Sequence, residues 1–167
     1  MTILDAPLIS SLRRNHGLEH ATINILAQRF PSRPLAGYSF PGGFLILGNV
    51  PTDELREAVF QALVRMGNGE RRLAIHPGCG TNYVTSGFVA GGLAWLGMAG
   101  TKSRREQVER LPLAIALAIL GLIVSQPLGP VIQQRVTTSG DPGGLTVVDV
   151  FPVRFGRFSL HRVVTRN

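Results

Sequence analysis

Two short segments contain three of the four histidines and the single cysteine of the chain. His16 and His20 belong to the sequence HGLEH, and His76 and Cys79 belong to the later sequence HPGCGTN. On a helix, residues four positions apart lie on one face, so the imidazoles of His16 and His20 could bind one metal ion together. A turn rich in Pro and Gly would present His76 and Cys79 as further ligands. The pattern predicts a zinc-type site of three imidazoles and one thiolate.

The carboxylate and the thiol of this set each have several possible roles. Glu19 could be a ligand, the general base that deprotonates metal-bound water, or an outer carboxylate that orients an imidazole. Cys79 could be a ligand, a nucleophile with His76 as its base, or a small buried apolar residue. We predict Glu19 as the catalytic base. We predict Cys79 as a ligand, because His76 and Cys79 lie on one tight turn and this arrangement suits shared ligation.

The number of ligands separates two kinds of site. Zinc bound by all four predicted ligands has a closed tetrahedron, which is typical of structural sites, whereas catalytic zinc keeps one position open. Catalysis therefore requires one of the four to lie outside the coordination sphere, or an expanded sphere. Zinc is the expected ion because thiolates favour it, and iron or manganese remains an alternative.

The segments around the motifs predict the elements that position them. Apolar residues recur at helical spacing over residues 7–30, so a helix is expected to carry the first motif. A β-hairpin is expected at residues 37–48, and a helix at residues 52–66 with Thr52 as its N-cap. Residues 73–75 are expected to form a short strand that leads His76 into its turn.

Two long uncharged stretches occupy the centre of the chain. No Asp, Glu, Lys or Arg occurs over residues 73–101 or 111–134. The second stretch is apolar over roughly the 20 residues needed to cross a bilayer, and small residues in the first suit close helix contact in lipid. We therefore expect a transmembrane helical hairpin. The alternative is a soluble domain with two buried helices and no metal.

The fold class that follows is α+β, in three regions. Residues 1–82 are expected to form the metal-binding region, with an N-terminal amphipathic helix, small antiparallel strands and a second helix. Residues 83–130 are expected to form the transmembrane hairpin. Residues 131–167 contain two strands around Gly156, which could pair as a hairpin or join the N-terminal strands in one sheet. His161 lies in one of these strands and is expected to be structural or exposed.

Charge and cysteine content limit the partners. The net charge is +7, but the 17 Lys and Arg residues are scattered, with no run longer than two, so we do not expect a nucleic-acid partner. A single cysteine excludes an intrachain disulfide and fits a reducing compartment. The first residues do not show the pattern of a cleaved signal peptide.

The motifs resemble those of the YqhQ-like family of bacterial membrane proteins. Members typically read HGAEHK and later HPRCGT before a membrane segment, where this chain reads HGLEHA and HPGCGT. A third similarity is QQRVTT followed by Asp141 and Pro142, where the family has LQxxTTxEP. The resemblance covers residues 16 to about 150. This chain is shorter than typical members and has Ala21 and Gly78 where they have basic residues, so a shorter related group of unknown function is the alternative.

The resemblance implies an integral protein of the bacterial inner membrane with metal at His16, His20, His76 and Cys79. Both termini are expected in the cytoplasm, with membrane lipid as a partner, and the oligomeric state stays open. We expect a zinc-dependent hydrolase at the membrane interface, acting on a membrane peptide or a lipid-linked substrate. The alternative is a non-enzymatic membrane protein whose structural zinc joins the N-terminal helix to the His76 turn and whose surface serves a partner protein.

Overall fold

The computed structural model describes residues 2–155 and 158–167 and divides the chain into two compact units. The first unit contains Met1–His76 and Gln134–Asn167, and the second contains Pro77–Gln133. The turn expected at Gly156 lies outside the described residues. Each unit is described separately below.

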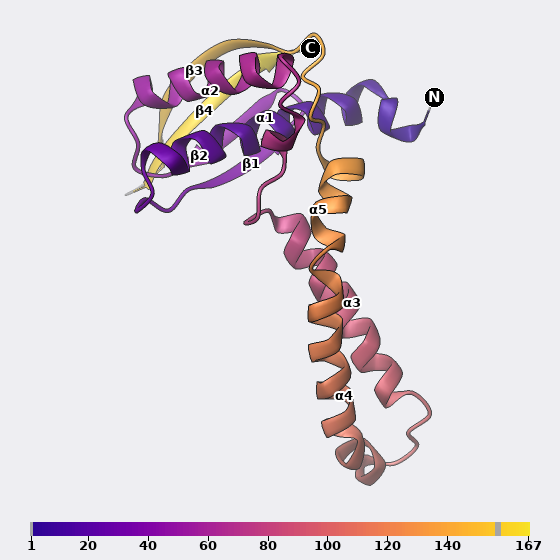
Figure 1. Cartoon of the computed structure of the whole chain (residues 1–167). Coiled ribbons are helices and arrows are strands. Elements are labelled where there is room, and N and C mark those ends of the chain that lie inside the picture. Colours follow the sequence, from indigo (N-terminus) through magenta and orange to yellow (C-terminus); the bar gives the residue numbers. More distant parts are fainter. Residues whose placement is uncertain (1, 156–157) are drawn as a thin grey trace. The chain divides into compact units, whose positions relative to one another are not determined.

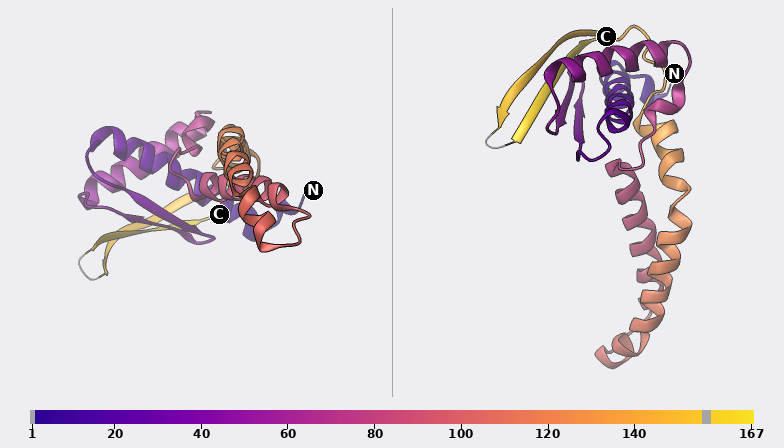
Figure 2. Two further views of the ribbon diagram at one scale, coloured as in Figure 1. Left: turned by 90° about the horizontal axis from the view of Figure 1, so that it is seen from below. Right: turned by 60° about the vertical axis from the view of Figure 1, so that its left-hand side comes forward.

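The first unit is a layer of two helices on a four-stranded antiparallel sheet (Figures 1 and 2). A short 3-10 helix, Ile3–Asp5, precedes α1, which spans Pro7–Arg29, and α2 spans Thr52–Gly67. The strands are β1 (Ala36–Phe40), β2 (Gly43–Leu47), β3 (Thr146–Phe155) and β4 (Phe158–Arg166), in the order β1-β2-β4-β3. The α+β class, the first helix and the N-terminal hairpin are therefore confirmed. The two C-terminal strands pair with each other, and β4 also joins β2, so one sheet contains both hairpins.

The core of this unit follows the periodicity of its elements. In β2, Phe44 and Ile46 are fully buried against the helices, and the residues between and after them are more exposed. In α1, Leu18 and Leu26 are fully buried on one face. Gly43 sits where β2 meets β4, and a Cβ there would lie 2.0 Å from the Val163 carbonyl oxygen. Close strand pairing at this point therefore requires glycine.

The prediction of a strand at residues 73–75 is wrong. The chain forms a 3-10 helix, η2, over Arg71–Ala74. Its carbonyls bond to side chains of α1 instead of to a neighbouring strand: Asn24 Nδ2 donates to Leu73 O and Ile75 O at 3.0 Å each. Because α1 satisfies these acceptors, the segment needs no place in the sheet.

Thr52 is the first residue of α2, and the N-cap position predicted for it is occupied by Pro51. The Thr52 hydroxyl lies 3.1 Å from Nε2 of His161. His161 is buried in β4, where it is only 2% exposed and faces Pro152 of β3. Burial lowers the pKa of His161 below its usual value.

The second unit is a helical hairpin in which α3 (Gly80–Met98) packs against α4 (Arg104–Ser125) and the short α5 (Leu128–Ile132) (Figure 1). A Cβ on Gly121 would lie 2.6 Å from the Ala90 Cα, so small residues allow close approach of the helices. A π-helical turn, Gln133–Thr137, leads back to the first unit.

Large apolar side chains remain exposed on this helix pair, including Phe88 at 82% and Trp95 at 70%. Within the described residues, one helix, Arg104–Ser125, is long and apolar enough to cross a membrane by length and composition. The predicted helix pair is present, and its transmembrane placement stays a prediction.

Candidate metal centre

Helix α1 places two of the predicted ligands side by side. His16 and His20 lie one turn apart, their ring centroids are 4.3 Å apart, and a nitrogen of each ring lies within 4.8 Å of one of the other. His20 is buried and His16 is half-buried. The i, i+4 spacing of the sequence therefore brings the two imidazoles within reach of one ion.

The hydrogen bonds of these rings determine which nitrogen could bind a metal. His16 Nδ1 lies 2.9 Å from Thr137 O, and His20 Nδ1 lies 2.8 Å from Ala74 O. A carbonyl oxygen only accepts, so in both rings Nδ1 carries the proton and donates it. In a neutral imidazole the lone pair is then on Nε2. Both rings have the tautomer and the outer partner that metal-binding histidines typically have.

The ring of His76 is also oriented by a hydrogen bond at Nδ1, and here the acceptor belongs to a side chain. Its Nδ1 lies 2.8 Å from Asn24 Oδ1. The amide orientation is determined because Asn24 Nδ2 donates to the two carbonyls of Leu73 and Ile75, which leaves Oδ1 as the accepting end. His76 Nδ1 is therefore the donor, and Nε2 carries the lone pair. The ring centroid of His76 is 5.7 Å from that of His20.

Asn24 was not among the predicted site residues. A signal for it existed, since Asn24 continues the i, i+4, i+8 series of His16 and His20 on one face of α1. Within the described residues its side chain makes three hydrogen bonds, to Leu73 of η2 and to the two residues that follow η2. It therefore connects the ring of His76 to the helix that carries the other two histidines.

Cys79 belongs to the second unit and is the N-cap residue of α3. It follows His76 by three residues, so the chain alone keeps their Cα atoms within roughly 11 Å of each other. Cysteine and histidine are both residue types that bind zinc, so Cys79, His16 and His20 could each supply a metal ligand.

Glu19, the predicted base, is 4% exposed and lies against β1. Ser39 Oγ donates to its Oε2 at 2.5 Å. A Cβ on Gly37 would lie 2.0 Å from Glu19 Oε1, so glycine at this point of the strand makes room for the carboxylate. A buried carboxylate needs such polar partners, and they also limit the directions in which it can turn.

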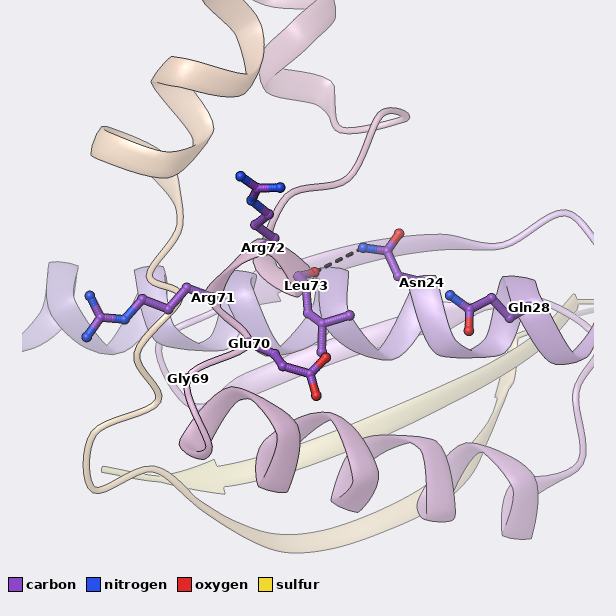
Figure 3. A pocket seen from close by; sticks show the side chains of 7 residues that line it. All are labelled: Asn24, Gln28, Gly69, Glu70, Arg71, Arg72 and Leu73. Carbon is purple, nitrogen blue, oxygen red and sulfur yellow. Dashed lines mark hydrogen bonds between the residues drawn. The ribbon is translucent and has the colours of Figure 1, made fainter.

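An open hollow of about 560 Å³ lies in the first unit beside Asn24 (Figure 3). Figure 3 shows the Asn24 amide turned toward Leu73, with Gln28 farther along α1 and the side chains of Arg71 and Arg72 extending in different directions. The carboxylate of Glu70, which also lines the hollow, accepts three hydrogen bonds from Arg65. These bonds lower the pKa of Glu70 and raise that of Arg65.

Comparison with known proteins identifies a family without an assigned function. The domain of unknown function DUF6391 matches residues 11–150, which include both histidine motifs. An uncharacterised protein of Picosynechococcus sp. is 37% identical over an alignment of 142 positions, which covers 77% of this chain and 66% of that protein. The match therefore covers just under two thirds of the relative. No solved structure was found to match. The chain belongs to the family defined by this domain of unknown function, DUF6391.

Proposed function

We propose that this protein is a membrane-embedded, zinc-dependent hydrolase. The observation that carries the proposal is the shared orientation of three imidazoles. In His16, His20 and His76, Nδ1 donates to an oxygen of the first unit, which places the lone pair on Nε2. Three neutral imidazoles prepared in this way match the donor set of a zinc site.

The thiol of Cys79 is the fourth proposed ligand or a close neighbour of the site. Three ligands with one open position would make the centre catalytic, and four would make it structural. Bound zinc would supply a Lewis acid that lowers the pKa of water to about 7. Glu19, one residue before His20, would accept the proton of the attacking water, and Ser39 would hold its carboxylate in place.

The membrane part of the proposal is supported by the second unit. Side chains along α4 such as Leu113, Ile115 and Ile123 are more than half exposed, and apolar surface of this kind is characteristic of contact with lipid or protein. A helix of 22 residues is about 33 Å long, against roughly 30 Å for the hydrocarbon core. We propose the bacterial inner membrane, with both termini in the cytoplasm. The resemblance to the YqhQ-like proteins supports the same location, and a membrane peptide or a lipid-linked molecule would be the substrate.

The alternative function is structural zinc in a membrane protein that serves a partner. It is favoured by the burial of His20, which is 1% exposed, since closed structural sites exclude water. The two proposals differ in what chelation does. Removal of a structural ion unfolds the site, whereas removal of a catalytic ion from a preformed site leaves the fold in place.

The first test is zinc content per chain of the full protein purified in detergent. We expect about one zinc per chain in the wild type and none in a His16→Ala/His76→Ala double variant. Gln28→Ala, on the same helix, is the control and should retain the ion. Equal zinc in the wild type and the double variant would overturn both proposals.

A Glu19→Gln variant then separates the catalytic proposal from the structural one. The catalytic proposal expects bound zinc, an intact fold and loss of hydrolysis of a membrane peptide or lipid-linked substrate. Retention of full hydrolytic activity in Glu19→Gln would contradict the role of this residue as the base.

A further inference from the structure

A second hollow, of about 200 Å³, lies in the first unit between α1, η2 and the loop after the π-helical turn. The residues that line it include Arg13, Arg71, Ser139, Gly140 and Asp141. Two arginines and one aspartate therefore surround a space large enough for a small polar group.

Arg13 is anchored, but its charge is not neutralised by a salt bridge in the described part of the chain. Nη2 donates to Arg135 O and Thr138 O at 3.1 Å each. Nε is buried, and none of the described residues accepts a hydrogen bond from it. The carboxylate of Asp5 is hydrogen-bonded to Thr2, and these bonds chiefly, with a smaller contribution from the charge of Arg13, lower the pKa of Asp5. A buried donor without an acceptor is unfavourable, and a small shift of the side chain toward a bound oxyanion would satisfy it.

Arg71 contributes the second charge. Among the described residues it forms no salt bridge, because the adjacent carboxylate of Glu70 is bonded to Arg65. Gly140 lets the loop approach Arg71 closely, since a Cβ there would lie 2.7 Å from the Arg71 Cβ and 2.8 Å from its carbonyl oxygen. Asp141 partly balances the charge of the hollow, and its Oδ1 accepts the Gly143 N–H at 2.8 Å.

We propose that this hollow binds a phosphate group. Two guanidinium groups against one carboxylate leave net positive charge, and phosphate oxygens can accept from separate arginines at the same time. The group could belong to free phosphate or to a lipid headgroup, and the chemistry of recognition is the same for both.

The hollow is also lined by residues whose backbone, or whose neighbour's backbone, bonds to the histidines of the candidate metal centre. Ala74 lines it, and the Ala74 carbonyl accepts from His20. Thr138 lines it as well and follows Thr137, whose carbonyl accepts from His16. A phosphate bound there would anchor a substrate beside the imidazoles, and this further step rests on the proposed hydrolase function.

The test uses the full chain in detergent, freed of metal by a chelator and shown by circular dichroism to keep its fold. Inorganic phosphate, dihexanoyl phosphatidic acid and, as a headgroup control, dihexanoyl phosphatidylcholine are titrated by calorimetry. We expect saturable binding of phosphate that weakens about tenfold in Arg71→Gln, since one charge-assisted contact is lost. Tighter binding of phosphatidic acid than of phosphate would identify a lipid headgroup, and equal binding would identify a free phosphate group.

Arg71→Gln is the main variant because Arg71 is exposed, and the described part of the chain shows no side-chain bond that its loss would break. Arg13→Gln should weaken binding similarly, but it also removes bonds that hold the loop. The matched control is Arg33→Gln. Like Arg13→Gln it loses a bond to a backbone carbonyl, here that of Asn49, and it should bind phosphate as tightly as the wild type.

Three results would overturn the proposal: no saturable phosphate binding, unchanged affinity in Arg71→Gln, or loss of phosphate binding in His76→Ala, whose ring bonds to Asn24, which does not line the hollow. The last would place the anion at the imidazoles instead. Because the protein is free of metal, phosphate binding can succeed where the zinc proposal fails, and the two failures remain distinguishable.

Discussion

Asn24→Ala is the substitution that most directly tests how the candidate metal centre is built. It removes two bonds to the carbonyls of Leu73 and Ile75 and one from His76. At about 0.5–1.5 kcal/mol each, the three bonds predict a loss of about 1.5–4.5 kcal/mol in the free energy of unfolding of the metal-free protein. Loss of an outer partner of a ligating histidine typically lowers metal affinity about 10- to 100-fold, which is about 1.4–2.7 kcal/mol.

Two assays measure these effects separately. Trp95 lies in the second unit, so its fluorescence is a poor probe of α1, and hydrogen exchange of the α1 amides should be used for stability. Zinc affinity is measured by competition with a chelator of known affinity. Gln28→Ala, one turn farther along α1, is the control and should change neither quantity.

Zinc binding by Asn24→Ala as tight as that of the wild type would contradict the role of Asn24 as the outer partner of a ligand. His76 would then not be a ligand, or its orientation would not depend on Asn24. A loss of stability without a loss of zinc affinity would make Asn24 a purely structural link between α1 and η2.

Three further predictions concern the first unit. Gly17→Ala should lower the free energy of unfolding by about 1–3 kcal/mol, measured by urea denaturation, because its Cβ would lie 2.1 Å from Ser139 O; equal or higher stability would show that the loop moves aside. Burial lowers the pKa of His161, so the unfolded state binds more protons, and stability should fall as the pH drops below about 6.5 toward the folded pKa. This loss should be smaller in His161→Leu, and an identical pH dependence in both proteins would contradict it. Arg29→Ala should cost about 1 kcal/mol, less at high salt, because Arg29 pairs with Glu54 at 2.9 Å with only a quarter of its side chain exposed; a cost that does not change with salt would exclude an ionic contribution.

Local periodicity was sufficient for much of the fold. The helical spacing over residues 7–30 predicts α1, observed at Pro7–Arg29, and the turn after Phe40 predicts the first hairpin. These predictions succeeded because one buried face imposes its period on the residues that form it. The prediction of a strand at residues 73–75 failed because the hydrogen-bond partners of this segment come from a helix far away in the chain. No local sequence pattern indicates such partners.

The same distinction applies to the candidate site. The spacing of His16 and His20 is sufficient to place two imidazoles on one face of a helix. The tertiary structure determines which nitrogen of each ring carries the proton, because the acceptors are the carbonyls of Ala74 and Thr137 from distant segments. Every residue has a backbone carbonyl, so a carbonyl acceptor leaves no mark in the sequence. The residue types of the site could therefore be read from the chain, and their protonation and orientation follow only from how the first unit packs.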